Sequence, residues 1–196
     1  MVSKQTPSQT IGPFFSYCLT PGQYEYPLTD IAGPNLIEDE IDGARIRVTG
    51  QVLDGEGNPI DDAMIEIWQA DPQGRYAHPA DPRGSNSRFR GFGRVGTGTD
   101  PDNRFFFDTV KPGSVDDKQA PHLNMIVHMR GMLNHAFTRV YFSDEAEANA
   151  TDPVLQSVDE ARRATLIAER EETEDGVSYR FDIHMQGENE TVFFDA

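Results

Sequence analysis

Short apolar runs with a period of two residues recur along most of this chain, and they constrain its fold more than any other feature. The clearest run covers residues 176–187, where apolar side chains alternate with polar ones. Alternate side chains of a strand point to opposite faces of a sheet, so this run predicts a strand with one buried face. Similar runs, rich in β-branched and aromatic residues, predict further strands at 44–54, 63–71, 103–110, 120–129, 136–144 and 191–196.

Turn-forming residues separate these runs, and only one helix is well signalled. Ser157 and Glu160 make a capping box ahead of "ARRATLI". The acidic, alanine-rich stretch 144–153 is typical of a solvated turn or a short helical piece. Several short strands with one late helix predict an all-β chain, folded as an antiparallel β-sandwich with one or two short helices.

Two segments depart from this pattern. Residues 1–43, rich in Pro, Gly and aromatics without clean periodicity, predict an N-terminal arm that lies on its own domain or on a partner. Residues 44–196 then form the β-sandwich domain. Residues 71–103 form a long loop region, and a loop of this length in a compact domain is either disordered or functional. Its aromatics and arginines favour ordered packing and therefore a binding face.

The charge balance limits the kinds of partner. Acidic residues outnumber basic ones by 33 to 17, which gives a net charge of −16. This disfavours nucleic acid and anionic membranes, because phosphate binding needs clustered Lys and Arg. The first residues lack the apolar core of a signal peptide, so we expect a cytoplasmic protein. Cys18 is the single cysteine, and we interpret it as a small buried side chain.

The run "APHLNMIVHM" has the outline of a metal-binding strand. His122 and the residue two positions on share one face of a strand, as two ligands of one ion would. That second residue is Asn124, whose neutral amide is a poor ligand for a transition metal. The pattern of a site is present, but one ligand is missing.

Motifs along the chain occur in an order that resembles the intradiol ring-cleaving dioxygenases, from about Thr6 to the C-terminus. They read "TPSQTIGPFF", "EIWQADPQGRY", "FGRVGT", "TVKPG", "APHLN" and "YRFDIHMQGENETVFFD". The resemblance implies a prealbumin-like β-sandwich around a non-haem ferric ion, held by two tyrosines and two histidines. Phenolate oxygens and imidazoles are donors that suit ferric iron.

The implied ligand set is incomplete in this chain. Tyr76 matches the first tyrosine and His122 the first histidine, but Asn124 stands where the second histidine is implied. Residues 113–121, where the second tyrosine is implied, contain no tyrosine. We therefore predict that this chain holds no metal and carries no catalytic residue of its own.

Some members of the family have two homologous chains, and "TPSQT", "HLN" and "GENETVFFD" resemble the alpha chain, whose metal site has decayed. The resemblance implies a partner, a homologous iron-bearing β subunit that holds Fe(III), in an α/β hetero-oligomer. The assembled enzyme would cleave 3,4-dihydroxybenzoate (protocatechuate) with O₂ to 3-carboxy-cis,cis-muconate, in aromatic catabolism by the β-ketoadipate pathway. We expect this chain to be inactive alone.

The resemblance also implies residues that line the substrate pocket at the α/β interface. In the arm these are Thr10, Gly12, Pro13 and Phe14, although the family often has tyrosine where Phe14 stands. Arg130 matches an arginine near the pocket, and a guanidinium suits a substrate carboxylate by forked hydrogen bonding. The simpler interpretations are a packing arm and a surface ion pair.

Two alternatives stay open at this point. One is a prealbumin-like β-sandwich binding module without an enzymatic role. The other is a self-contained intradiol dioxygenase, against which the missing tyrosine and Asn124 both count. Colour separates them, because a chain with its own iron–tyrosinate centre would be burgundy when purified alone.

Overall fold

The computed structural model describes residues 10, 12, 14–37, 41–84 and 89–195 of the 196-residue chain. The strands are β1 (Arg45–Leu53), β2 (Met64–Gln69), β3 (Phe92–Gly96), β4 (Arg104–Val110), β5 (His122–His128), β6 (Ala136–Phe142), β7 (Ile167–Thr173), β8 (Gly176–Arg180) and β9 (Ile183–His184). The helices are α1 (Phe14–Leu19), α2 (Ala146–Asn149) and α3 (Pro153–Ser157), with 3₁₀ turns η1 (Pro21–Tyr24) and η2 (Glu160–Leu166). None of the described helices is long and apolar enough to cross a membrane.

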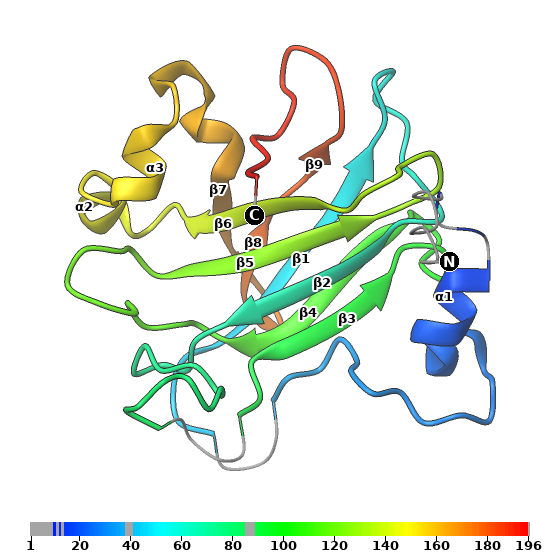
Figure 1. Ribbon diagram of the computed structural model, residues 1–196, viewed down its shortest axis with the longest axis horizontal. Helices are drawn as coiled ribbons and strands as arrows, with labels where there is room; N and C mark the ends of the chain where they lie inside the picture. The colour runs from blue at the N-terminus through cyan, green and yellow to red at the C-terminus, as the bar shows by residue number, and fades with distance from the viewer. Residues whose placement is uncertain (1–9, 11, 13, 38–40, 85–88, 196) are drawn as a thin grey trace, which may run out of the picture.

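The strands form two layers, and the expected sandwich is confirmed (Figure 1). Strands β3, β2, β5 and β6 make one antiparallel layer. The other layer contains β8, β1 and β4, with β9 beside β1. Strand β7 joins the layers, because it pairs with both β6 and β8. The sheet is mixed and not purely antiparallel as expected, since β1 runs parallel to β8 and β9, and β6 parallel to β7.

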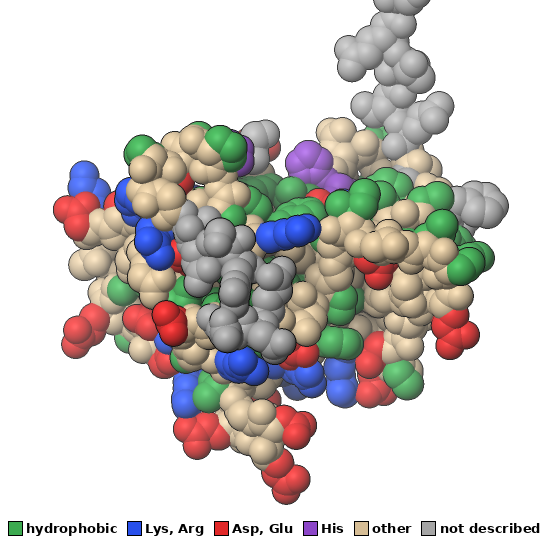
Figure 2. Space-filling view, turned by 90° about the horizontal axis from the view of Figure 1, so that it is seen from below, with side chains coloured by type: hydrophobic (Ala, Val, Ile, Leu, Met, Phe, Trp, Pro, Cys, Tyr) green, Lys and Arg blue, Asp and Glu red, His purple; other side chains and the backbone are tan. Residues whose placement is uncertain are grey.

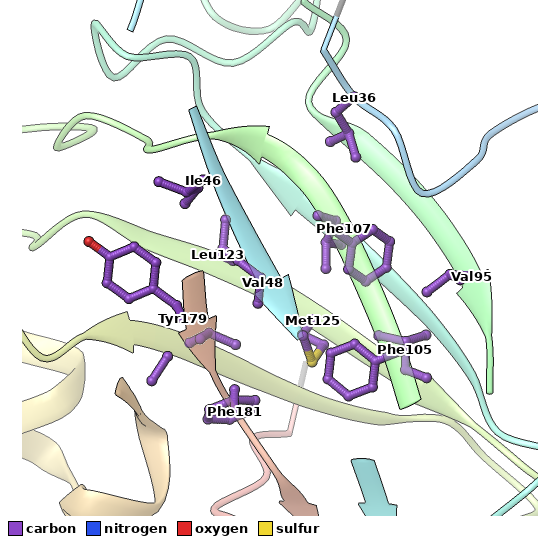
Figure 3. Packing of buried hydrophobic residues seen from close by; sticks show 14 of the residues in the cluster. Leu36, Ile46, Val48, Val95, Phe105, Phe107, Leu123, Met125, Tyr179 and Phe181 are labelled. Atoms are coloured by element: carbon purple, nitrogen blue, oxygen red, sulfur yellow. The ribbon is translucent and has the colours of Figure 1, made fainter. Parts of the chain in front are cut away.

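The hydrophobic core lies between the two layers, where the predicted alternation places it. Val48, Phe105, Phe107, Leu123 and Met125 are fully buried and meet between the sheets (Figure 3). Their neighbours along each strand are more exposed, as the period of two requires. Part of the predicted arm also reaches this core, through Leu36 and Ile41.

The segment 176–187 forms two strands instead of one. Strand β8 ends at Arg180, the chain bends at Phe181, and β9 follows. Both strands pair with β1, where a Cβ atom on Gly50 would lie 1.9 Å from the carbonyl oxygen of Phe181. Only glycine permits such a close approach of two backbones, so Gly50 and the bend belong together.

The helix predicted from a capping box at Ser157 is wrong in its start. Ser157 is the last residue of α3, and its hydroxyl donates to the carbonyl oxygen of Val154 at 2.7 Å. The caps are two aspartates instead: Asp152 accepts from first-turn amides of α3, and Asp159 does the same for η2. A carboxylate at the N-cap satisfies amides that have no partner within the helix.

The alternation of apolar residues also fails to predict two strands, and it predicts one strand of which only a single bridge is present. Strand β3 lies inside the predicted loop 71–103, and its two glycines hide the pattern. Strand β7 is largely charged and exposed, so it has little apolar alternation. The predicted strand 191–196 contributes one bridge, between Phe137 and Phe194. Cys18 is exposed, so its interpretation as a buried side chain is wrong.

Candidate functional site

The positions matched to iron ligands on β5 and in the loop region after β2 lie together in the structure. Asn124 pairs with Trp68 of β2, and the Tyr76 ring stacks on the Trp68 ring with centroids 5.8 Å apart. The amide nitrogen of Asn124 donates to the hydroxyl of Tyr76 at 3.1 Å. Two of the expected ligand positions are therefore hydrogen-bonded to each other. Burial raises the pKa of Tyr76, so this side chain is a neutral phenol at physiological pH.

His122, the third matched position, forms a contact with the backbone of its own chain. The ring is buried, and its Nδ1 atom lies 2.8 Å from the carbonyl oxygen of Ala120. Because a carbonyl only accepts, Nδ1 carries the proton in this contact. The ring also lies against Tyr141, whose hydroxyl donates to the buried carboxylate of Asp152 at 3.0 Å. Burial lowers the pKa of His122, which keeps the imidazole neutral.

A guanidinium lies beside these residues. Arg139 of β6 pairs with Asn124 across the sheet, and its Nη1 atom donates to the side chain of Gln119 at 3.0 Å. Its positive charge acts on both residues: it lowers the pKa of Tyr76 against the larger effect of burial, and it lowers the pKa of His122 in the same direction as burial. A cation beside these side chains opposes the binding of a metal ion.

These residues do not fit ferric iron. The phenol is neutral, the amide is a weak donor, and the imidazole proton points to a backbone carbonyl. Within the described part of the chain, no cluster of three or more His, Cys, Asp or Glu side chains could hold a metal ion. Asn124 and Tyr76 satisfy each other, and the imidazole of His122 is satisfied by the carbonyl oxygen of Ala120.

A cavity of about 560 Å³ opens beside the stacked rings of Trp68 and Tyr76. The rest of its lining comes from the loop region after β2, namely His78, Ala80, Asp81, Pro82 and Arg83. The loop is ordered here, because Asp81 accepts from Arg83 and from the Tyr76 amide. Arg83 also donates to two backbone carbonyls, of Gly74 and Val115. The predicted ordered packing is therefore present in residues 71–84.

The arm residues implied for the substrate pocket lie at a different end of the sheet. The Thr10 hydroxyl oxygen accepts a hydrogen bond from the amide of Gly131 at 2.9 Å. Gly12 precedes α1 and accepts from the Phe15 amide at 3.0 Å, and Phe14 begins α1. Pro13 lies outside the described residues. The structure thus brings Thr10 to the residue that follows Arg130.

Arg130 itself is 58% exposed and paired with acidic residues. Its Nε atom donates to Asp62, and its Nη2 atom lies 3.9 Å from Asp61. The hydrogen bond with Asp62 raises the pKa of Arg130, so the guanidinium is charged at every physiological pH. With Nε occupied, the outer edge of the guanidinium is the part available to a second carboxylate.

The sequence reasoning did not find the residues that attach the arm to the sheet. Gln23 contacts the backbone of Gly96, and Arg94 contacts the carbonyl oxygen of Leu19. Both contacts join residues more than 70 positions apart, so no local pattern could have shown them. In Figure 2, hydrophobic side chains and histidines lie along the upper edge of the view, while acidic side chains lie mostly along its sides and lower edge.

The sequence of this chain is similar to those of known dioxygenases. The dioxygenase family model matches residues 24–187. The protocatechuate 3,4-dioxygenase alpha chain of Burkholderia cepacia is 53% identical, over 98% of both chains. The beta chain from the same organism is 35% identical, over 76% of this chain and 67% of the beta chain.

A solved structure supports the fold independently. The intradiol ring-cleavage dioxygenase from Tetranychus urticae superposes with a TM-score of 0.60 at 21% identity, and the match covers 92% of this chain and 94% of that chain. The mixed sandwich described above is therefore the fold of these enzymes. The chain belongs to the intradiol dioxygenase family.

Proposed function

We propose that this chain is the iron-free alpha subunit of a protocatechuate 3,4-dioxygenase. The observation that carries the proposal is the hydrogen bond between Asn124 and Tyr76, which joins two of the expected ligand positions. A chain that still bound iron would need both side chains free to face the metal. Full-length similarity to an enzyme named as an alpha chain supports the same assignment.

The partner in this proposal is a homologous beta subunit that holds Fe(III), in a cytoplasmic α/β hetero-oligomer. A protein named as a beta chain shares 35% identity with this chain, so the two subunits would have related folds. The assembled enzyme would cleave protocatechuate with O₂ to 3-carboxy-cis,cis-muconate in the β-ketoadipate pathway of aromatic catabolism. Nucleic acid and membranes are not among the partners.

This chain would contribute one wall of the substrate pocket. Thr10, Gly12, Pro13 and Phe14 would line it, and Arg130 would face the substrate carboxylate. The charged, half-exposed guanidinium of Arg130 supports its role, because its outer edge can form a forked pair with a carboxylate. In a protein of net charge −16, a cation at the pocket would also favour the approach of an anionic substrate.

Reconstitution tests the proposal. The chain would be expressed alone and together with a beta chain of the family, and iron content and ring-cleaving activity would be measured in each preparation. We expect iron and activity only in the combined preparation. Stoichiometric iron in the lone chain, with the colour of an iron–tyrosinate centre, would refute the assignment.

The cavity beside Trp68 and Tyr76 favours a second candidate, a β-sandwich module that binds a small aromatic molecule without catalysis. Its volume is in the range of ligand pockets. Trp68 is the only tryptophan of the chain, so its fluorescence reports on this cavity alone. Quenching by protocatechuate in the lone chain, combined with no activity in any combination with a beta chain, would favour the module.

A further inference from the structure

The part of the arm that contains the proposed pocket wall is held at both of its ends. At the first end, Thr10 accepts a hydrogen bond from Gly131. At the second end, Gln23 reaches the turn that follows β3. Along the chain, Gly12 and α1 lie between these two attachments. A segment fixed at both ends loses less conformational freedom when a substrate binds against it.

Gln23 makes three hydrogen bonds with one side-chain amide. Its Oε1 atom accepts from the Gly96 amide at 2.7 Å, and its Nε2 atom donates to the Gly96 carbonyl oxygen at 3.1 Å. The same Nε2 atom donates to the Thr99 hydroxyl at 3.1 Å. Gly96 ends β3, which is the edge strand of its layer. The Gln23 amide therefore pairs with the open edge as a residue of a neighbouring strand would.

A further contact holds the arm to the sheet between its two attached ends. The Nη1 atom of Arg94 donates to the carbonyl oxygen of Leu19, the last residue of α1, at 3.4 Å. Arg94 is itself fixed by Glu66 of β2, with 2.7 Å between the two side chains. This ion pair is largely buried, so its geometry is well determined by its surroundings. It holds the helix end over the outer face of the layer.

The turn that Gln23 contacts also supports Arg130. The Thr97 hydroxyl accepts from the amide of Ala63 at 3.2 Å, and the Thr97 amide donates to the Ala63 carbonyl oxygen at 2.9 Å. A Cβ atom on Gly98 would lie 2.5 Å from the carbonyl oxygen of Asp61, so the two segments are in direct contact. Asp61 and Asp62 in turn lie beside the Arg130 guanidinium.

We infer that Gln23 is a positioning residue for the substrate pocket. It fixes the arm to the same turn that supports Asp62 and Arg130, and so sets the distance between the pocket wall and the carboxylate-binding guanidinium. The inference rests on the proposed function, because the pocket is that of the α/β enzyme. Gln23 touches neither substrate nor metal in this scheme, and it acts through the arm.

The test uses the Gln23→Glu variant in the assembled complex with a beta chain. This change keeps the shape and the acceptor for Gly96 but replaces the Nε2 donor by an oxygen that faces the Gly96 carbonyl. Loss of hydrogen bonds of this kind predicts about a fivefold rise in KM for protocatechuate, with kcat within about twofold of the wild type. Gln23→Leu removes all three bonds and should raise KM at least as much.

The matched control is Gln186→Glu, which makes the same charge change at an exposed residue after β9. It should leave KM unchanged. Hydrogen exchange of the amides in α1 and η1 gives a readout that does not depend on activity, and both Gln23 variants should reduce protection there. Unchanged thermal unfolding of the complex would confirm that the effect is local.

Failure of the inference and failure of the proposed function are distinguishable. An inactive wild-type complex would refute the function. Unchanged arm protection in Gln23→Glu would refute the attachment, whether or not the complex is active. Reduced protection with an unaltered KM would show that the attachment does not position the pocket, and would equally overturn the inference.

Discussion

The region of the matched ligand positions, around Tyr76, His122 and Asn124, differs from the region around Arg130 in how its polar groups are bonded. In the first region, polar side chains are buried or half-buried and bonded to one another, as Asn124 is to Tyr76 and Tyr141 to Asp152. In the second region, Arg130 is more than half exposed, and Leu133, three residues further along the chain, is an apolar residue with 64% of its surface open to solvent. The polar groups of the first region are part of the scaffold. The second has the exposed apolar and charged groups that an interface and a binding site require.

The comparison predicts that substitutions in the two regions have different consequences. Changes in the region of the matched ligand positions should lower the free energy of unfolding without altering catalysis by the complex. Changes at Arg130 should do the reverse, because an exposed ion pair contributes little to stability.

The largest effect on stability is expected for Asp152→Ala. The Asp152 carboxylate is buried and accepts from the Tyr141 hydroxyl, the Ala120 amide and two amides of α3. Removing it leaves buried donors without a partner and an uncapped helix, so the free energy of unfolding should fall by about 3 kcal/mol. Urea unfolding measures this loss. Asp159→Ala removes an exposed cap and should cost less than about 1 kcal/mol; equal losses would contradict the buried role of Asp152.

A smaller effect is expected from separating Asn124 and Tyr76. Asn124→Leu and Tyr76→Phe should each destabilise the chain, with a coupling free energy of about 1 kcal/mol in a double-mutant cycle. The measurement is urea unfolding of the two single variants, the double variant and the wild type. In complex with a beta chain, both variants should keep wild-type kcat and KM. A coupling near zero, or a loss of activity, would contradict the account of this pair as a contact that stabilises the chain and takes no part in catalysis.

The smallest effect concerns pH. Burial lowers the pKa of His122 in the folded chain below its value in the unfolded chain, so the unfolded state binds the proton more readily. The stabilisation from a neutral His122 is complete above the unfolded pKa of about 6.5 and declines as the pH falls toward the folded pKa. His122→Phe should therefore show a weaker loss of stability than the wild type between pH 7 and pH 5. Parallel curves would contradict a buried, neutral imidazole.

The sequence predicts the parts of this fold that depend on neighbouring residues. Alternation placed β2, β4, β5 and β6 correctly, because each strand has one face in the core. It missed β3 and β7, because their own residues are glycine-rich or charged and show little apolar alternation. It also could not show the direction of β1 relative to β8, since two strands far apart in sequence can pair either way.

The same limit applies to the site. Motif order matches Tyr76, His122 and Asn124 to a ligand set, but it could not show that they bond to other groups in their own chain. The resemblance implies that Arg130 lies near a pocket, which stays a prediction, and it could not show that Arg130 pairs with Asp62, 68 residues earlier. Gln23 stands in a segment without periodicity, and its contact with Gly96 exists only in the folded chain. Residues that act through long-range contacts leave no local signal.

Substrate discrimination by the Arg130→Ala variant tests most directly whether this chain binds substrate for its partner. Steady-state kinetics of the assembled complex would be measured with protocatechuate and with catechol, which lacks the carboxylate, beside an Arg104→Ala control at an exposed surface pair. Loss of a charge-assisted pair predicts that KM for protocatechuate rises about 10- to 100-fold, with iron content, thermal unfolding and catechol turnover unchanged. An equal change for both substrates, or none for either, would contradict the claim that the iron-free chain supplies the carboxylate-binding wall.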